Sequence, residues 1–316
     1  MNVRRVLAAT IGSVALLGVA ACGGGDDDPL ADDNGGGGDK GSLVVSGQDF
    51  TEGQIMAEMY DQVLSASGYD VEQKLVETRD IYFSQLTKGS VDVVPDYLSG
   101  IGDYLNIDAN GPDAKPITTN SPDESLDAIS PLADKAGISL LEPAEATNQN
   151  AYAVTEEFAK DNDLKTLSDL GKLDQSITLA ANPDCEDRMD CAKGLEQVYK
   201  IDIEQVLPLG FGGAPTRNSV KDGESQLGQF GTTDPTVEGA GLVFLEDDKG
   251  LQPAQNLTPA VNTEFLEDHS DIADTLNELS AGLTTDALMD LNDQVGNERA
   301  AVPDVVEQYL TDEGLL

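Results

Sequence analysis

Residues able to perform covalent chemistry are scarce in this sequence. It contains one histidine, His269, and three cysteines, and it has no tryptophan. The patterns of a serine-hydrolase elbow, a zinc-protease helix and a phosphate-binding loop are all missing from it. Catalysis would have to rest on carboxylates, and nothing marks out a pair among the many Asp and Glu residues. We therefore expect a protein that is not an enzyme and that needs no metal or cofactor.

Two of the cysteines are close together in the chain. Cys185 and Cys191 lie in the segment NPDCEDRMDC. In an exported protein, two neighbouring thiols are expected to form a disulfide. A metal site is the poorer alternative because no histidine lies nearby to complete a ligand set.

The third cysteine follows an export signal. Residues 1–21 have a basic start and a short apolar run, too short to make a good membrane-spanning helix. The run ends in Val-Ala-Ala-Cys, which resembles the lipobox of bacterial lipoproteins, where cleavage precedes an acylated cysteine. We expect lipidation of Cys22 and a flexible Gly/Asp tether over residues 22–42. An ordinary secretory signal with an incidental cysteine is the alternative.

The charge of the chain limits its partners. The sequence has 18 Lys and Arg against 59 Asp and Glu, a formal net charge of −41. A surface so acidic repels phosphate backbones, so nucleic acid is excluded as a partner.

Strand and helix patterns alternate from residue 43 onward. SLVVSG, YDVEQKLV and SVDVVPDYLSG read as strands, and two amphipathic helical segments separate them. Strand–helix–strand units of this kind predict a parallel sheet with crossover helices. Ligands bind such sheets at the carboxyl ends of the strands, where Gln48, Asp96 and Tyr97 lie. In the first helix, one face is apolar: Ile55, Met56, Met59, Tyr60, Val63 and Leu64.

A second set of alternating elements begins near Asn150. The glycine-rich segment GFGGAP at 210–215 reads as a loop, since it lacks the pattern of a phosphate site. The chain then becomes helical at 271–281, 286–295 and 303–310, and we expect these helices to pack on the first lobe. The predicted class is α/β, with two lobes, mainly parallel sheets and a cleft between the lobes.

Blocks along the chain resemble the osmoprotectant-binding proteins of ABC importers, the glycine betaine/choline/carnitine type. They include VVSGQDFTEGQIMAEMYDQVL, TKGSVDVVPDYLSG, NQNAYAV, KDGESQLGQFGTTDP and LVFLEDDKGLQPAQNLTPAVN, in the family's order. The resemblance implies a type II periplasmic-binding-protein fold. It places lobe one at 43–147 plus 253–316 and lobe two at 148–252.

The resemblance also implies a binding site for a quaternary ammonium group in a box of aromatic rings. Ring faces attract a desolvated cation by about 0.5–2 kcal/mol each. Tyr97 and Tyr152 match box tyrosines of the two lobes. The other positions expected to contribute to ligand binding are Gln48, Arg79, Asp96, Asn150, Thr216, Phe230, Thr232, Thr233 and Asp234.

Two positions depart from the family pattern. Gln48 stands where the family often has a lysine that holds a ligand carboxylate. Gly231 stands where an aromatic residue often precedes Thr-Thr-Asp, and Phe230 is one place earlier. Choline, which has no carboxylate, fits the missing lysine better than glycine betaine does.

The expected function is therefore solute capture for import. The chain would bind an osmoprotectant outside the cytoplasm, held by lipid at the outer face of the cell membrane, and deliver it to an ABC permease and its ATPase. One alternative is a tethered sensor that reports ligand without transport. Another is an exported hydrolase with a carboxylate pair.

Overall fold

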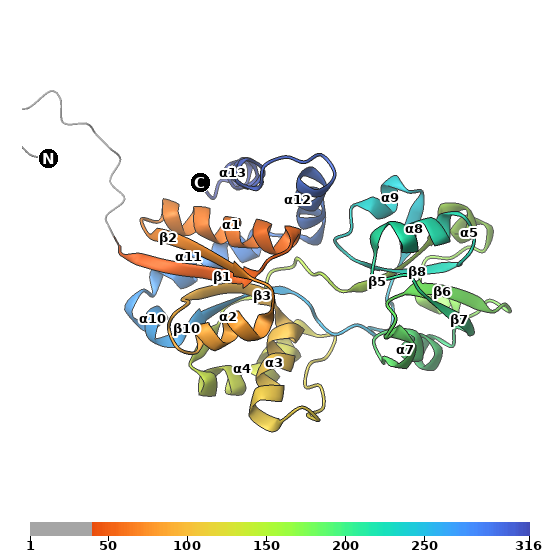
Figure 1. The fold of residues 1–316 in the computed structure, drawn as a ribbon, viewed down its shortest axis with the longest axis horizontal. Helices are drawn as coiled ribbons and strands as arrows, with labels where there is room; N and C mark the ends of the chain where they lie inside the picture. Colours follow the sequence, from red (N-terminus) through yellow and green to blue (C-terminus); the bar gives the residue numbers. More distant parts are fainter. Residues whose placement is uncertain (1–39) are drawn as a thin grey trace, which may run out of the picture. The chain divides into compact units, whose positions relative to one another are not determined.

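Two five-stranded sheets organise the protein in a computed structural model that describes residues 40–316 (Figure 1). The first sheet has the order β2-β1-β3-β10-β4. Strand β1 runs parallel to its neighbours β2 and β3, whereas β10 is antiparallel to β3 and β4. Its strands are β1 (Ser42–Gln48), β2 (Asp70–Val76), β3 (Val93–Tyr97), β4 (Ile138–Leu140) and β10 (Leu257–Asn262).

The second sheet repeats this pairing pattern, with the order β7-β6-β8-β5-β9. Its β6 is parallel to β7 and β8, and β5 is antiparallel to β8 and β9. Its strands are β5 (Asn150–Thr155), β6 (Ile177–Ala181), β7 (Ile203–Pro208), β8 (Leu227–Gly231) and β9 (Leu242–Leu245). The expected two-lobed α/β class with mainly parallel sheets is confirmed. In each sheet a single strand, β10 or β5, runs against its two neighbours, so the sheets are mixed.

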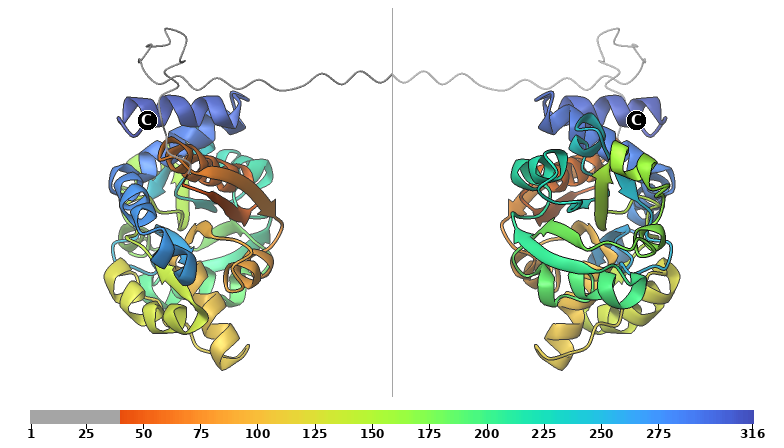
Figure 2. Two further views of the ribbon diagram at one scale, coloured as in Figure 1. Left: turned by 90° about the vertical axis from the view of Figure 1, so that its left-hand side faces the viewer. Right: turned by 90° about the vertical axis from the view of Figure 1, so that its right-hand side faces the viewer.

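Helices cover both faces of the first sheet (Figures 1 and 2). The predicted apolar face of α1 is buried in one core cluster, against the last three helices of the chain. A second cluster fills the other face, beneath α2, α3 and α4. The elements are α1 (Thr51–Ala66), α2 (Arg79–Leu86), α3 (Leu98–Asn110), α4 (Pro122–Ala136), α10 (Thr263–Asp268), α11 (Asp271–Gly282), α12 (Thr285–Gly296) and α13 (Val302–Asp312). The expected return of the terminal helices to the first lobe is confirmed.

Shorter helices cover the second sheet. They are α5 (Glu156–Asp161), α6 (Leu167–Leu170), α7 (Ala192–Gly194), α8 (Gly213–Lys221) and α9 (Thr236–Gly239). The helix α8 begins inside the segment 210–215 that we expected to be a loop, and Thr216 lies within this helix.

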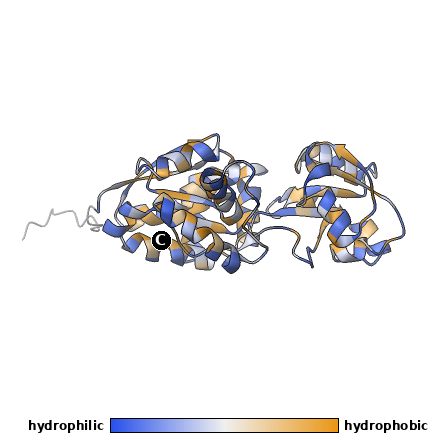
Figure 3. Cartoon of the chain, turned by 90° about the horizontal axis from the view of Figure 1, so that it is seen from below, coloured by the Kyte–Doolittle hydropathy of each residue, from blue (hydrophilic) through white to orange (hydrophobic). Residues whose placement is uncertain are grey.

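Hydropathy follows this architecture. In Figure 3 orange residues are concentrated along the strands, and the helices carry blue residues as well. Among residues 40–316, no helix combines the length and the apolar character needed to cross a bilayer. Cys22, the signal segment and nearly all of the tether lie outside the described residues.

The expected disulfide is present between Cys185 and Cys191, with a Cα–Cα distance of 5.2 Å and a sequence separation of 6. Both cysteines are buried in the core cluster of the second lobe. A bond that closes so short a loop stabilises the fold by about 2 kcal/mol, mainly by restricting the unfolded chain. We expect Cys185→Ala/Cys191→Ala to lower the free energy of unfolding by about this amount in urea denaturation. Wild-type protein measured in a reductant should show the same loss, and an unchanged midpoint in both experiments would contradict the prediction.

Candidate functional site

Asp96, near the end of β3, is held by a dense set of hydrogen bonds. Arg79 donates to it through Nε at 2.8 Å and Nη2 at 2.9 Å, and the Tyr82 hydroxyl donates at 2.7 Å. The backbone N–H of Tyr97 donates at 2.7 Å. Burial alone would lower the pKa of Arg79, but the bond to Asp96 and its charge raise that pKa overall. Arg79 and Asp96, which we expected to contribute to ligand binding, therefore neutralise each other.

Gly100 has no side chain, and this leaves space for the guanidinium of Arg79. A Cβ at this position would lie 2.5 Å from Arg79 Nη2, closer than a Cβ approaches a non-bonded atom. The glycine in the first turn of α3 thus permits the bidentate pair to form beneath it.

Tyr97 ends β3 and directs its phenol to the start of α1. The ring packs against the core cluster beside α1, and its hydroxyl donates a short hydrogen bond to Glu52 Oε1. Burial raises the pKa of Tyr97, and the charge of Glu52 raises it further. The phenol is therefore a fixed neutral donor, and the ring is held rigidly at the strand end.

Glu52 is the centre of this region, although sequence reasoning did not single it out. It lies in the first turn of α1 and is only 3% exposed. Besides Tyr97, its carboxylate accepts from Asn148 Nδ2 at 2.8 Å and from Asn292 Nδ2 of α12. Asn292 Nδ2 also lies 3.4 Å from the carbonyl oxygen of Thr233, so the set reaches the segment after β8. Four stretches of chain that are distant in sequence meet at this carboxylate.

The charge of Glu52 is uncompensated by any basic side chain. Its three partners are neutral donors, and no ion pair among residues 40–316 includes it. A buried carboxylate in such a setting favours a cation brought close to it, because the charge has lost its water without gaining a counter-charge. This is the electrostatic environment that suits a cationic ligand.

Tyr152 and Asn150 of β5 belong to a second polar group around Asp190. Tyr152 is 1% exposed within the second-lobe core, and its hydroxyl donates to the Asp190 carbonyl at 2.9 Å. Asn150 Nδ2 donates to Asp190 Oδ2 at 3.0 Å and to Gln252 Oε1 at 3.1 Å. Arg188 pairs with the same Asp190 carboxylate. The structure thus joins Asn150 and Tyr152, but it does not bring the rings of Tyr97 and Tyr152 together.

The residues after β8 anchor the crossing between the lobes. Thr232 Oγ1 donates to the carbonyl of Thr147 at 2.6 Å and accepts from the N–H of Gln149 at 3.1 Å. Asp234 accepts from the backbone N–H of Thr236 at 2.9 Å and from its hydroxyl at 2.6 Å, at the start of α9. Thr232 and Thr233 therefore lie next to the Glu52 group, and the carboxylate of Asp234 serves a local turn.

The remaining expected site residues lie elsewhere. Phe230 is fully buried in the core, edge-on to Phe244, and Thr216 is buried with its hydroxyl donating to the Gly210 carbonyl at 2.8 Å. Both side chains are interior in this conformation, and neither is bonded to the Glu52 or the Asp190 group. Gln48 is exposed and donates to the carbonyl of Glu77 at 3.1 Å.

Two cavities are lined by residues of both lobes. One, of about 570 Å³, lies beside Asp190 and includes Asp103 and Thr118 of the first lobe with Arg188 and Met189 of the second. Burial raises the pKa of Asp103, the charge of Arg79 opposes this, and that of Asp190 adds to it. A volume in this range suits a small solute.

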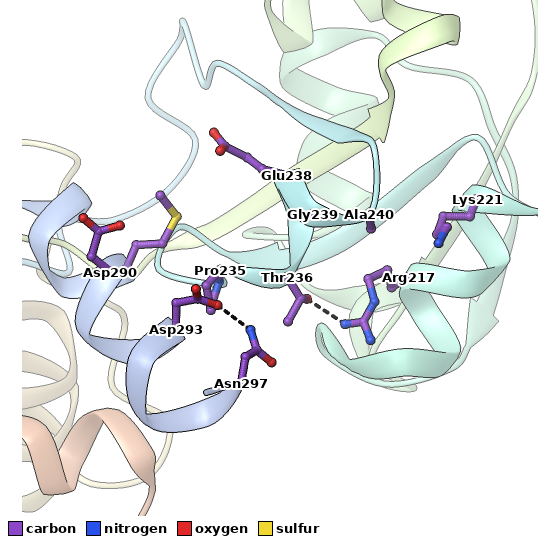
Figure 4. Close-up of a pocket in the computed structure, with 11 residues that line it drawn as sticks. Arg217, Lys221, Pro235, Thr236, Glu238, Gly239, Ala240, Asp290, Asp293 and Asn297 are labelled. Carbon is purple, nitrogen blue, oxygen red and sulfur yellow. Dashed lines mark hydrogen bonds between the residues drawn. The ribbon is translucent and has the colours of Figure 1, made fainter. Parts of the chain in front are cut away.

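The other cavity, of about 500 Å³, lies between α8 and α9 on one side and α12 on the other (Figure 4). Arg217 donates to the Thr236 hydroxyl at 2.6 Å within it. Its lining carries both signs of charge, with Lys221 on α8 and Asp290 and Asp293 on α12. Because this lining carries both signs of charge, it suits charged contacts between the lobes better than the binding of a methylated ammonium group. Among residues 40–316, no group of His, Cys, Asp and Glu side chains could hold a metal ion.

Comparison with known proteins agrees with this architecture. Residues 41–312 match the model of the substrate-binding domain of ABC-type glycine betaine transport systems. The glycine betaine-binding protein YehZ of Escherichia coli is 27% identical over 274 residues, which are 84% of this chain and 88% of that protein. A glycine-betaine-binding protein of Pseudomonas aeruginosa is 23% identical over 290 residues, 87% of this chain and 89% of that protein.

A solved structure supports the fold. The crystal structure of a glycine betaine/carnitine/choline ABC transporter superposes with a TM-score of 0.74 at 19% identity, covering 86% of this chain and 99% of that one. The family model spans nearly every described residue and describes a binding domain and not an enzyme. The chain therefore belongs to the family of substrate-binding domains of ABC-type glycine betaine transport systems.

Proposed function

We propose that this protein captures a quaternary ammonium osmoprotectant, choline or a betaine, outside the cytoplasm and delivers it to an ABC permease driven by an ATPase. The observation that carries the ligand class is Glu52, a buried carboxylate with neutral hydrogen-bond partners and the ring of Tyr97 beside it. A methylated ammonium group has no N–H to donate. It can therefore approach this group and gain charge attraction without displacing the hydrogen bonds that Glu52 already accepts.

The capture mechanism in this proposal is closure of two lobes. Lobe one comprises 43–147 plus 253–316, and lobe two comprises 148–252. The segment Asn148–Asn150 links both polar groups, because Asn148 donates to Glu52 and Asn150 donates to Asp190. A cation that neutralises Glu52 would stabilise the arrangement in which both lobes meet at this segment. Tyr152, Thr232 and Thr233 would form the second-lobe wall.

The membrane attachment in this proposal is a lipid on Cys22. The Gly/Asp tether would then let the binding domain move near the permease. Two acyl chains suffice for stable anchoring.

A ligand screen tests the ligand class. We expect choline or a betaine to raise the thermal stability of the purified chain lacking residues 1–22, with glycine betaine, proline betaine, carnitine and ectoine also tested. A ligand at 100 times its Kd adds about 2.7 kcal/mol to the stability of the native state. If no quaternary ammonium compound shifts the transition, the proposed ligand class is wrong.

The two tyrosines test the aromatic part of the site. Replacing Tyr97 or Tyr152 by Ala should weaken the binding found in the screen by about 2- to 30-fold, since each ring contributes about 0.5–2 kcal/mol to a desolvated cation. Calorimetric titration of each variant measures this, with circular dichroism to show that the variant is folded. Unchanged affinity in both folded variants would remove the two rings from the site.

A further inference from the structure

Phe211 has an unusual place for a large apolar side chain. It is 45% exposed, in the turn between β7 and α8. Residues 148–252 contain six Tyr and Phe rings, all within the described part of the chain, and Phe211 is the exposed one among them. A single exposed apolar residue needs no explanation by itself. The surroundings of Phe211, however, indicate a reason for its exposure.

The turn that carries Phe211 is firmly built. The N–H of Gly210 donates to the carbonyl of Ala181 at 3.0 Å, and the N–H of Gly212 donates to that of Gln229 at 2.9 Å. Gly210 has φ 102° and Gly212 has φ 59°, values that favour glycine. The Thr216 hydroxyl closes the turn from within α8 by donating to the Gly210 carbonyl. Two strands and a helix therefore hold the backbone of the turn that carries Phe211.

The ring of Phe211 lies over Gly231, the last residue of β8. A Cβ at Gly231 would lie 3.5 Å from Phe211 Cζ and 3.6 Å from Cε1. The same Cβ would lie 2.7 Å from Asn148 Oδ1, so Gly231 lets both side chains approach its backbone. Asn148 in turn donates to Glu52 through Nδ2. The exposed ring and the asparagine that donates to Glu52 therefore both lie against the backbone of Gly231.

We propose that Phe211 supplies the second-lobe ring face that packs against the ligand's methylated ammonium group, so that the cation lies between this ring and Glu52. This rests on the proposed function and adds a specificity-determining residue to it. A ring attracts the charge through its face and also excludes water, whereas an aliphatic side chain of similar size offers only the exclusion of water. Phe211 would thereby favour methylated ammonium over a neutral group of the same shape.

Titration calorimetry with choline and with its neutral isostere 3,3-dimethyl-1-butanol tests this. We expect Phe211→Ala to weaken choline binding by about 10-fold and Phe211→Tyr to retain it, in line with the size of single cation–ring attractions. Phe211→Leu should lower the affinity for choline more than the affinity for the isostere, so the ratio of the two affinities should fall. Val243→Ala, an exposed apolar truncation in the same lobe, should leave both affinities unchanged.

The outcomes separate the two proposals. If the wild-type chain binds no quaternary ammonium compound, the proposed function fails. If the wild-type chain binds choline and Phe211→Ala binds it equally well, only the role of Phe211 is lost. If Phe211→Leu weakens choline and the isostere by the same factor, the ring acts by apolar contact and the assignment of charge selectivity is overturned.

Discussion

Glu52→Gln is expected to lower the affinity for choline or a betaine by about 30-fold or more while leaving the fold intact. Gln has the shape of Glu and can still accept from Asn148 or Asn292, but it carries no charge. Removing a charge that a buried partner depends on costs about 2–5 kcal/mol, which is the origin of the expected factor. Titration calorimetry of the variant against the wild-type chain gives the ratio of the two Kd values.

A matched control separates local charge from overall charge. Glu72→Gln removes one negative charge from an exposed position on β2, where the side chain pairs with Lys74. Because the whole chain is strongly acidic, a general field effect would weaken binding in both variants and would fade at high salt. We expect the loss only in Glu52→Gln and at all salt concentrations. Equal losses in the two variants would show that Glu52 has no specific role.

Neutral isosteres sharpen the same experiment. If Glu52 acts on the ligand's charge, Glu52→Gln should reduce the affinity for choline far more than that for 3,3-dimethyl-1-butanol. A similar loss for both would mean that Glu52 only positions Tyr97, Asn148 and Asn292 around the site. The comparison therefore distinguishes direct attraction from a positioning role.

Local patterns in the sequence predicted much of the fold. The apolar face of α1 and the three terminal helices are where periodicity places them, with ends that differ by one or two residues. The directions of β5 and β10 were not predictable in this way. Both strands follow a segment in which the chain crosses from one sheet to the other. Their direction cannot be inferred from the apolar pattern, because apolar residues alternate in the same way in parallel and antiparallel strands.

The site was harder to predict than the fold, for a related reason. Position at a strand end identified Asp96 and Tyr97, but it did not show that Asp96 would form an ion pair with Arg79. Phe230 and Thr216 lie near the expected region in sequence, yet their side chains face the core. Glu52 carried no distinguishing signal, because an acidic residue in the first turn of a helix is common for the sake of the helix dipole. Its partners Asn148 and Asn292 are 96 and 240 residues away.

Arg79→Met is expected to destabilise the first lobe by leaving a buried carboxylate without its charged partner. It leaves the Asp96 carboxylate, 3% exposed, with only the Tyr82 hydroxyl and the Tyr97 N–H as donors. Removing one partner of a buried pair costs about 3–5 kcal/mol. The guanidinium is 31% exposed and solvent can partly replace it, so we expect a loss near the lower figure, about 3 kcal/mol, in urea denaturation without ligand.

A double variant shows whether the loss of stability in Arg79→Met comes from the unpaired charge of Asp96. In Arg79→Met/Asp96→Asn both charges are gone, and much of the lost stability should return, because burying a neutral amide is far less costly than burying an unpaired carboxylate. Lys74→Met, which breaks an exposed ion pair with Glu72, should change the free energy of unfolding by less than about 1 kcal/mol. If the double variant is as unstable as the sum of the two single changes, the pair makes no coupled contribution. The end of β3 would then be held by packing around Tyr82 and not by the charges beneath Tyr97.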